Sequence, residues 1–346
     1  AQALSKISDI IGEKNENSLL KVQKELLQNG LEKCWEPRKS SYKYIDRDSG
    51  FAQRGKVLLR QTGGGEIKIK EKFAKAIRIQ IEIKPKDKIA RRPTAEIKEF
   101  VTKAGDDEFI SALDFKLTDA GSVATSKKIY TKIGKITVDD IAEDDKVIIR
   151  SVDLRADDHT QLLPLWAEMM DKDKAQKLVS RIVCNAEKFE RPFGLPACPI
   201  PPTKASEATC LSVHLPWNQL VAEGLLAYGY QAETTRLFVR LMHGVLHNLK
   251  NNNAFYERYN AEVGTGIGER NALEGLAPVG LFLQILGVRI ISDTQVRLEG
   301  QNPFPWAVTV RYRGLIVIRE MHKTEITFSN GEQVEVTDEA PCFISV

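Results

Sequence analysis

The spacing of hydrophobic residues changes three times along this chain of 346 residues, and each change limits what the segment can fold into. Residues 1–55 and 156–288 carry apolar residues at the three- and four-residue spacing of amphipathic helices. Residues 56–155 instead alternate apolar and charged residues, which is typical of half-buried strands. Residues 289–346 return to this alternation and predict a C-terminal β-strand region. The two periods together predict an α+β fold.

The first alternating segment predicts a β domain of its own. The alternation is clear in AIRIQIEIK and KVIIRSVDLR, and turn signals such as TGGG, KPKDK and TDAGS separate the expected strands. This spacing is typical of an antiparallel sandwich of about 90 to 100 residues. Because helical sequence stands on both sides, we interpret residues 56–155 as a β-sandwich inserted into a helical domain. Its outward lysines are interpreted as a solvated surface, with a basic binding face as the alternative.

The helical segments predict antiparallel helix pairs. HTQLLPLWAEMM precedes KAQKLVSRIVCN, and LSVHLPWNQLVAEGLLAYGY precedes ETTRLFVRLMHGVLHNLK, an order that favours a helical toroid. ALEGLAPVGLFLQILG is apolar almost throughout, which predicts a helix buried on nearly every side. Near the start, residues 4–11 and 19–26 predict one or two helices, with a stop signal at Gln28–Gly30.

Composition removes several classes of function. The 50 basic and 47 acidic residues nearly balance, so charge gives no reason to expect nucleic acid as a partner. No apolar run approaches the roughly 20 residues of a membrane helix, so no membrane partner is expected. Charged residues throughout positions 1–20 argue against a signal peptide. Five scattered cysteines without a CxxC spacing favour a cytoplasmic location, although Cys198 and Cys210 are an alternative disulfide pair.

Two patterns that would indicate other chemistry lack the necessary context. His243 and His247 stand four apart on a predicted helix, as two zinc ligands can, but no glutamate completes an HExxH frame. The glycines of GTGIGE follow a helix rather than a strand, which disfavours a nucleotide-binding loop. We therefore expect no metal and no other cofactor.

Four segments between Asp157 and Gly287 occur in one order: QLLPLWAEMMDKDKAQKLV, PFGLPACP, LPWNQLVAEGLLAYGY and FYERYNAEVGTGIGE. This series resembles the (α/α)6-barrel glycoside hydrolases related to glycoside hydrolase family 63 and the mannosylglycerate hydrolases, with trehalases and glycogen-debranching glucosidases as more distant relatives. YKYIDRDSG also resembles the loop that precedes this series. The resemblance covers residues 1–55 and 156–288, and it implies that they form a partial (α/α)6 toroid around the inserted sandwich.

The resemblance implies an inverting mechanism, in which one carboxylic acid protonates the glycosidic oxygen and a second carboxylate activates water about 6.5–9.5 Å away. In the family, the base is the glutamate of a Phe-x-Glu-x-Tyr motif, which corresponds here to Phe255, Glu257 and Tyr259. The residues themselves agree, because this carboxylate follows a helix end on a predicted glycine-rich loop and is flanked by aromatic rings that can stack on a sugar. The alternative is that Glu257 is a surface residue paired with Arg258.

The second carboxylate has no clear counterpart. The family's general acid is an aspartate in a Gly-x-Asp-Asn-Ser-Pro-like motif, and the sequence contains no such motif. The nearest substitutes, all in a different context, are Asp46, Asp48, Asp153, Asp157 and Asp158. We therefore expect this chain to be a fragment that carries the base, with the general acid upstream of residue 1.

Further residues are predicted to hold the sugar. Trp217 in HLPWNQ corresponds to a Trp-Pro-rich loop that lines the sugar site in the family, although Leu215 stands where relatives often have tryptophan. Asp48 is either a contact to sugar hydroxyls or a turn residue, and Trp217 either a contact or a core residue. With Tyr259 and Phe255 they form the predicted substrate-binding set. The expected substrate is an oligosaccharide or small glycoside of α-linked glucose or mannose. The alternative function is a non-catalytic carbohydrate-binding or scaffold protein.

Overall fold

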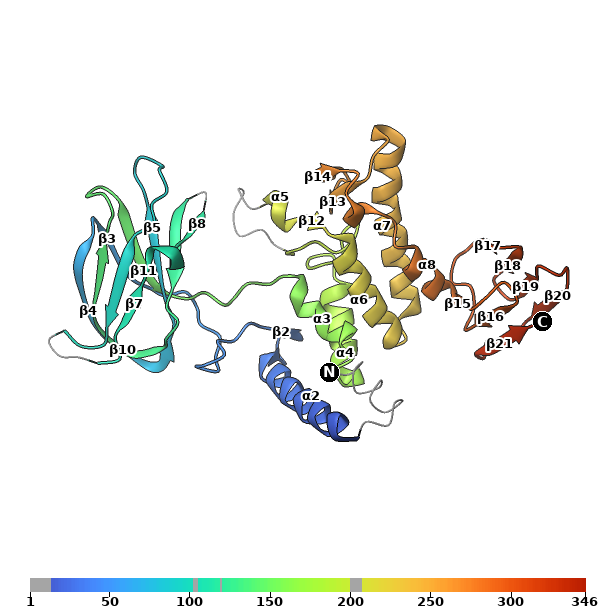
Figure 1. The fold of residues 1–346 in the computed structure, drawn as a ribbon, viewed down its shortest axis with the longest axis horizontal. Coiled ribbons are helices and arrows are strands. Elements are labelled where there is room, and N and C mark those ends of the chain that lie inside the picture. The colour runs from blue at the N-terminus through green and yellow to red at the C-terminus, as the bar shows by residue number, and fades with distance from the viewer. Residues whose placement is uncertain (1–13, 102–104, 119, 200–206) are drawn as a thin grey trace. The chain divides into compact units, whose positions relative to one another are not determined.

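The computed structural model divides the chain into two compact units, each of which is described by itself (Figure 1). Unit 1 comprises residues 1–36 and 42–156, and unit 2 comprises residues 37–41 and 157–346. The structure describes residues 14–101, 105–118, 120–199 and 207–346. Helices and several antiparallel sheets occupy separate segments of the chain, which confirms the predicted α+β class. The helix predicted over residues 4–11 lies outside the described residues.

The described part of unit 1 begins with the long helix α2 (Lys14–Cys34). The predicted stop at Gln28–Gly30 is wrong, because the helix continues through Gly30 for another turn. Gly30 does not adopt the positive φ that ends many helices at glycine, and it lies in open space. A glycine inside a helix costs about 1 kcal/mol relative to alanine, which the flanking turns tolerate. The apolar side chains of Leu19, Val22 and Leu26 are exposed in the described part of unit 1.

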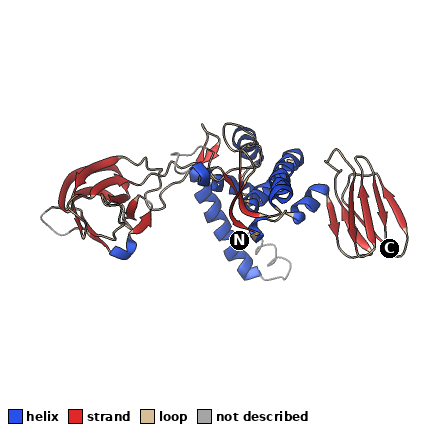
Figure 2. Cartoon of the chain, turned by 90° about the horizontal axis from the view of Figure 1, so that it is seen from above, coloured by secondary structure: helices blue, strands red, loops and turns tan. Residues whose placement is uncertain are grey.

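The rest of unit 1 is an antiparallel β-sandwich, which confirms the strands expected from the alternating sequence (Figure 2). One sheet has the order β3 (Val57–Thr62), β11 (Lys146–Ser151), β5 (Ile79–Lys84), β9 (Gly121–Thr125), β8 (Lys116–Thr118). The other has the order β4 (Gly65–Ile77), β10 (Tyr130–Asp139), β6 (Thr94–Lys98), β7 (Glu108–Ile110). The inward residues of both sheets form one core, which includes Ile67, Ile81, Ile97, Phe115, Ile133 and Ile149.

Arg78 joins the segment YKYIDRDSG to the sandwich. Its Nε donates a 2.6 Å hydrogen bond to Asp46, a second guanidinium nitrogen reaches Asp48 at 2.5 Å, and the third donates to the carbonyl of Ser126 at 2.9 Å. The carboxylate of Asp46 is buried and also accepts hydrogen bonds from the backbone of Asp48 and Ser49. Burial alone would raise the pKa of Asp46, but Arg78 and these backbone donors lower it to about 2.

The low pKa of Asp46 makes the stability of unit 1 depend on pH. The ionised carboxylate of Asp46 stabilises the folded state fully above its ordinary pKa of 3.8. This stabilisation is lost as the pH falls toward about 2, where the folded carboxylate becomes protonated. We expect a loss on the order of 1–2 kcal/mol in the free energy of unfolding between pH 4 and 2. Calorimetric unfolding at several pH values would show a shallower slope in Asp46→Asn than in the wild type. An equal slope in both proteins would contradict this assignment.

Of the two predicted helix pairs, the second is present in unit 2 as two long helices, whereas the region of the first forms shorter helical segments. The long helices α6 (Leu215–Ala227) and α7 (Gln231–Asn252) run antiparallel, joined by the turn at Tyr228–Tyr230. Helix α3 (Leu163–Trp166) packs against α6 at Gly224, where an added Cβ would lie 2.5 Å from the backbone nitrogen of Trp166. The shorter helical segments of this part are η2 (His159–Leu162), α4 (Lys172–Leu178), η3 (Val179–Val183), α5 (Glu207–Cys210) and η5 (Leu273–Gly275). Within the described residues, no helix combines the length and apolarity needed to cross a membrane.

Helix α8 (Val279–Leu286) is buried on one side only, so the prediction of burial on nearly every side is wrong. Leu281, Ile285 and Leu286 are buried, whereas Val279 is 63% exposed and Gln284 is exposed. The inward side is fixed by Phe282, which stacks on Phe238 of α7 at a centroid distance of 5.4 Å. The apolar composition of α8 therefore serves one packed face and leaves an apolar outer face.

The remaining strands of unit 2 form three small antiparallel sheets. The first contains β12 (Ser212–Val213), β13 (Tyr256–Asn260) and β14 (Gly266–Arg270). The second contains β15 (Val288–Ile290), β16 (Gln295–Leu298) and β21 (Cys342–Ser345). The third contains β17 (Val308–Tyr312), β18 (Leu315–Arg319), β19 (Thr324–Thr327) and β20 (Gln333–Val336). The last two confirm the strands expected in residues 289–346.

Candidate functional site

Glu257 lies on strand β13, the central strand of the sheet β12-β13-β14. The preceding helix α7 ends at Asn252, and Asn253 adopts the left-handed conformation that turns the chain toward this strand. The sequence predicts a glycine-rich loop around Glu257, whereas the structure has Glu257 on a strand whose hairpin partner carries the glycines. The candidate base therefore stands on a hydrogen-bonded element rather than on a free loop.

The hairpin is irregular opposite Glu257. Tyr256 pairs with Arg270 and Arg258 with Ile267, so the register shifts by one residue between them. At the shift, Gly268 has a φ of +84°, and an added Cβ would lie 2.3 Å from the carboxylate of Glu257. A glycine is therefore needed both for the backbone conformation and for the approach of the carboxylate.

Two groups contact the carboxylate of Glu257. The backbone N–H of Glu269 lies 3.4 Å from one oxygen, and Nε of Arg258 lies 3.2 Å from the other. The Nε–H bond of Arg258 is not directed at that oxygen, so the contact is electrostatic rather than a hydrogen bond. The side chain of Glu257 is 37% exposed. The carboxylate is thus fixed on one side and open to solvent on another, and the pairing with Arg258 considered from the sequence is present.

His214 lies within electrostatic range of both Glu257 and Arg258. Burial lowers the pKa of His214, the positive charge of Arg258 lowers it further, and the carboxylate of Glu257 opposes both effects. The net direction is downward from 6.5, so His214 is neutral at neutral pH. His214 is the N-cap residue of α6 and directly follows β12, the strand that pairs with β13.

A second histidine, His159, lies between Trp217 and His214. The ring of Trp217 stacks on His159 at a centroid distance of 4.5 Å, and His159 meets the edge of His214 at 6.3 Å. Burial lowers the pKa of His159, and the nearby Asp158 only partly opposes this, so His159 is also neutral at neutral pH. The structure therefore brings Trp217 and Glu257 to opposite ends of one row, with the histidines between them. Neither histidine was predicted from the sequence, although His214 directly precedes the LPWNQ segment.

A buried asparagine fixes the hairpin that carries Glu257. Asn248 of α7 is fully buried, and its amide donates to the carbonyl of Gly264 at 2.6 Å and to that of Gly244 at 2.8 Å. Its side-chain oxygen accepts a 2.9 Å hydrogen bond from the N–H of Gly266. These contacts tie the C-terminal part of α7 to both sides of the turn between β13 and β14.

A second asparagine fixes the loop PFGLP. Asn218 of α6 is buried, accepts from the N–H of Leu195 at 2.8 Å and donates to its carbonyl at 3.0 Å. A third hydrogen bond of 2.9 Å runs to the carbonyl of His214. The helix that carries Trp217 is therefore locked to this loop. The roles of Asn218 and Asn248 were not predicted, because no pattern in the sequence distinguishes them from surface asparagines.

The two aromatic residues around Glu257 lie in different surroundings. Tyr259 is buried. Its hydroxyl donates a hydrogen bond to the carbonyl of Gly275 at 3.0 Å and accepts one from the N–H of Tyr256 at 3.2 Å. Phe255 precedes β13 and is half-buried. In the described chain Tyr259 holds β13 against η5, and the predicted contacts of both residues with sugar stay predictions.

The aspartates considered from the sequence have other partners. Asp48 belongs to unit 1 and pairs with Arg78, and it is Asp46 rather than Asp48 whose side chain stabilises the turn. Asp153 pairs with Arg155 at 2.7 Å, and Asp158 caps η2 by accepting from the N–H of Thr160 at 2.9 Å. None of these contacts involves Glu257.

The other side chains with reactive or metal-binding chemistry are the cysteines and any clusters of His, Asp and Glu. All five cysteines are free, so Cys198 and Cys210 do not form a disulfide in this structure. Burial and the neighbouring Cys210 raise the pKa of the Cys198 thiol to about 12, which keeps it protonated. Within the described ranges, no cluster of three or more His, Cys, Asp or Glu residues could hold a metal ion.

Residues 148–278 match the family model described as trehalase. This segment contains Glu257, Trp217, Tyr259 and Phe255, together with His159 and His214. It is related to the glycoside hydrolases of the trehalase and family 63 type. Among the curated proteins, none matches the chain.

Solved structures give partial matches. A family 63 mannosylglycerate hydrolase from Thermus thermophilus in complex with glucose is 24% identical, over 39% of this chain and 32% of that chain, with a TM-score of 0.31. The neutral trehalase from Saccharomyces cerevisiae is 28% identical, over 33% of this chain and 21% of that chain, with a TM-score of 0.28. The chain thus spans about a third or less of the length of these hydrolases.

The contacts of Asn248 predict its contribution to stability. Asn248→Ala removes the partner of the buried carbonyl of Gly264 and of the part-buried N–H of Gly266, at about 1–3 kcal/mol for each group. We expect unfolding in urea to show a loss of about 2–4 kcal/mol. The matched control is Asn251→Ala on the same helix, which is exposed and should change stability by less than about 0.5 kcal/mol. Equal losses in both variants would contradict the role given to Asn248.

Proposed function

We propose that the chain is part of a glycoside hydrolase that cleaves an α-linked glucoside or mannoside with inversion, and that Glu257 is its general base. The match of residues 148–278 to the trehalase family supports the hydrolase. The observation that carries the assignment of Glu257 is its carboxylate, held by Gly268–Glu269 and Arg258 yet open to solvent. The proposal includes a cytoplasmic location and helices α3 to α7 as part of an (α/α)6 toroid.

In this mechanism the ionised carboxylate of Glu257 accepts a proton from a water molecule. The water oxygen attacks the anomeric carbon as the bond to the leaving oxygen breaks, and a second carboxylic acid protonates that oxygen from the opposite side. Arg258 holds the carboxylate of Glu257 in position through the ion-pair contact of 3.2 Å. His214 is neutral, so it adds no second positive charge and can hydrogen-bond water or a sugar hydroxyl.

The row of rings that ends at Trp217 supplies a surface for a sugar ring. Aromatic faces stack on the apolar face of pyranose rings, and the His159–Trp217 stack is partly exposed beside His214. Phe255 is proposed as a further sugar contact, whereas Tyr259 acts by holding β13 in place. The predicted contact of Asp48 with sugar rests on the sequence resemblance alone, and Asp48 has no role in the proposed mechanism.

The general acid is assigned to a carboxyl group outside residues 148–278. Asp46 does not fit this role, because a carboxyl with a pKa of about 2 is ionised at neutral pH and cannot donate a proton there. A non-catalytic sugar-binding protein is the second candidate, favoured by the lack of an acid motif in the sequence. Calorimetry with oligosaccharides separates the two candidates, because binding without turnover by the complete protein supports only the second.

Turnover tests the base directly. In the complete protein, Glu257→Gln removes the proton acceptor while keeping the shape of the side chain, and kcat should fall by about 10²- to 10⁴-fold. The melting temperature should stay close to that of the wild type. Glu269→Gln is the matched control, since it neutralises an exposed carboxylate on the neighbouring strand and should leave kcat within about twofold. Wild-type turnover of trehalose and aryl α-glycosides by Glu257→Gln would overturn the assignment.

The stereochemistry of the product tests the mechanism. A single displacement by water inverts the anomeric centre, so an α-glycoside should release the β-anomer of the sugar first. Proton NMR of the anomeric region within the first minutes, before mutarotation, distinguishes the two anomers. Initial release of the α-anomer would require a double displacement and would contradict general-base catalysis by Glu257.

A further inference from the structure

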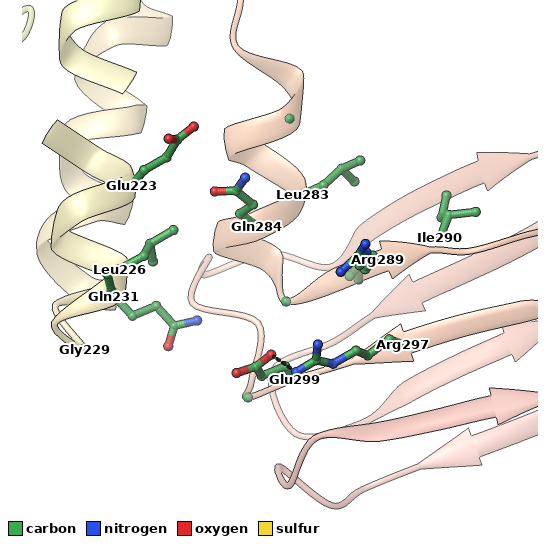
Figure 3. Close-up of a pocket in the computed structure, with 15 residues that line it drawn as sticks. Glu223, Leu226, Gly229, Gln231, Leu283, Gln284, Arg289, Ile290, Arg297 and Glu299 are labelled. Atoms are coloured by element: carbon green, nitrogen blue, oxygen red, sulfur yellow. Dashed lines mark hydrogen bonds and ion pairs between the residues drawn. The ribbon is translucent and has the colours of Figure 1, made fainter. Parts of the chain in front are cut away.

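A second cleft lies in unit 2 at the end of α6 opposite to His214. The turn between α6 and α7, helix α8 and strands β15 and β16 enclose a cavity of about 890 Å³ (Figure 3). Leu226 and Ala227, at the last turn of α6, line it. Because a helix rises about 1.5 Å per residue, the 13 residues of α6 place this cleft about 20 Å from the end that carries His214. It is therefore separate from the candidate site at Glu257.

Two arginines stand side by side in this cleft. Arg289 of β15 and Arg297 of β16 are direct partners in the antiparallel register, so their side chains leave the same face of the sheet. Arg297 pairs with Glu299 at 3.0 Å, and its Nε is buried with no acceptor among the described residues. Arg289 is exposed, and within the described ranges it has no ion pair or acceptor. The pair thus carries one positive charge more than its carboxylate balances.

This arrangement is unfavourable for the protein alone. Like charges directly opposite each other on neighbouring strands repel, and a buried guanidinium N–H without an acceptor is destabilising. An anionic group between Arg289 and Arg297 would relieve the repulsion between their charges. Guanidinium groups bind carboxylate and phosphate through two parallel hydrogen bonds, which fits a planar pair at the wall of a cleft.

The opposite wall offers hydroxyl partners and an apolar surface. Gln284 is exposed on α8, and its amide has no hydrogen bond within the described chain. Glu223 of α6 accepts from the indole of Trp166 at 3.1 Å and from Gln219 at 2.9 Å, which orients its carboxylate. Leu226 and Leu283 contribute apolar surface. These groups suit a ligand that carries hydroxyls on a compact carbon body.

We propose that this cleft binds a small hydroxylated organic anion, either a sugar phosphate or a sugar acid. Its phosphate or carboxylate lies between Arg289 and Arg297, its hydroxyls meet Gln284 and Glu223, and its carbon body rests on Leu226 and Leu283. The cavity volume lies within the range of about 300–1,000 Å³ that is usual for small-molecule sites. This site is independent of the hydrolase proposed above.

Isothermal titration calorimetry of the full chain tests this proposal with four probes: glucose 6-phosphate, glucuronate, inorganic phosphate and glucose. We expect at least one of the two sugar anions to bind more tightly than glucose, and the tighter one identifies phosphate or carboxylate as the anionic group. Arg289→Gln should weaken that binding at least tenfold. Arg311→Gln, which removes an exposed arginine from β17, should leave it unchanged, as should Glu257→Gln.

The melting temperature gives a second readout and guards against misfolding. Without ligand, Arg289→Gln should melt at or above the wild-type temperature, because it removes the repulsion with Arg297. With the bound anion, only the wild type should gain thermal stability. The proposal is overturned if neither sugar anion binds the wild type with a Kd below about 1 mM, or if Arg289→Gln binds as tightly as the wild type. Binding that Glu257→Gln abolishes would belong to the other site and would also overturn it.

Discussion

The position of Glu257 depends on the buried amide of Asn248. A single side chain near the C-terminal end of α7 satisfies backbone groups on both sides of the β13–β14 turn, at Gly264 and Gly266. Without Asn248 the buried carbonyl of Gly264 and the part-buried N–H of Gly266 would lose these partners, at a cost of about 1–3 kcal/mol for each unpaired group. The hairpin, and with it the approach of Gly268 to the carboxylate, is therefore fixed by the helix beneath it. Asn218 fixes the loop PFGLP to α6 in the same way.

The hydrogen bonds of Asn248 and Asn218 bring charged, neutral and aromatic side chains close to one another. Strand β13 presents Glu257 and Arg258, the start of α6 presents His214, and η2 presents His159 under the ring of Trp217. The only formal charges of this row are the carboxylate and the guanidinium, because burial keeps both histidines neutral. A site with one ionised carboxylate, neutral hydrogen-bonding rings and an aromatic wall is suited to a polar but uncharged ligand such as a sugar.

Much of the fold follows from local sequence, because the period of hydrophobic residues reflects which faces are buried. Strand β5 and helix α7 could be predicted in this way, since each buries one regular face. Gly30 was misjudged because a glycine ends a helix only when it turns left-handed, and this one does not. Helix α8 was misjudged because apolar composition says nothing about how many neighbours the helix has.

The candidate site was predicted only in part. The aromatic-glutamate-arginine series identified Glu257, and the HLPWNQ segment identified Trp217, because both are short continuous motifs. The contact of His159 with His214 joins residues 55 positions apart, and nothing local in the sequence indicates it. The roles of Asn218 and Asn248 depend on their burial, which also appears only in the folded chain.

Chemical rescue tests the central claim, that Glu257 delivers a nucleophile to the anomeric carbon, most directly. In the complete protein, Glu257→Ala opens a small space beside Gly268 and removes the base, so water is no longer activated. Azide needs no deprotonation and can attack from the same side. The account predicts that azide restores consumption of an aryl α-glycoside and yields the β-glycosyl azide. Full hydrolysis by Glu257→Ala without azide, or an α-configured azide product, would contradict it.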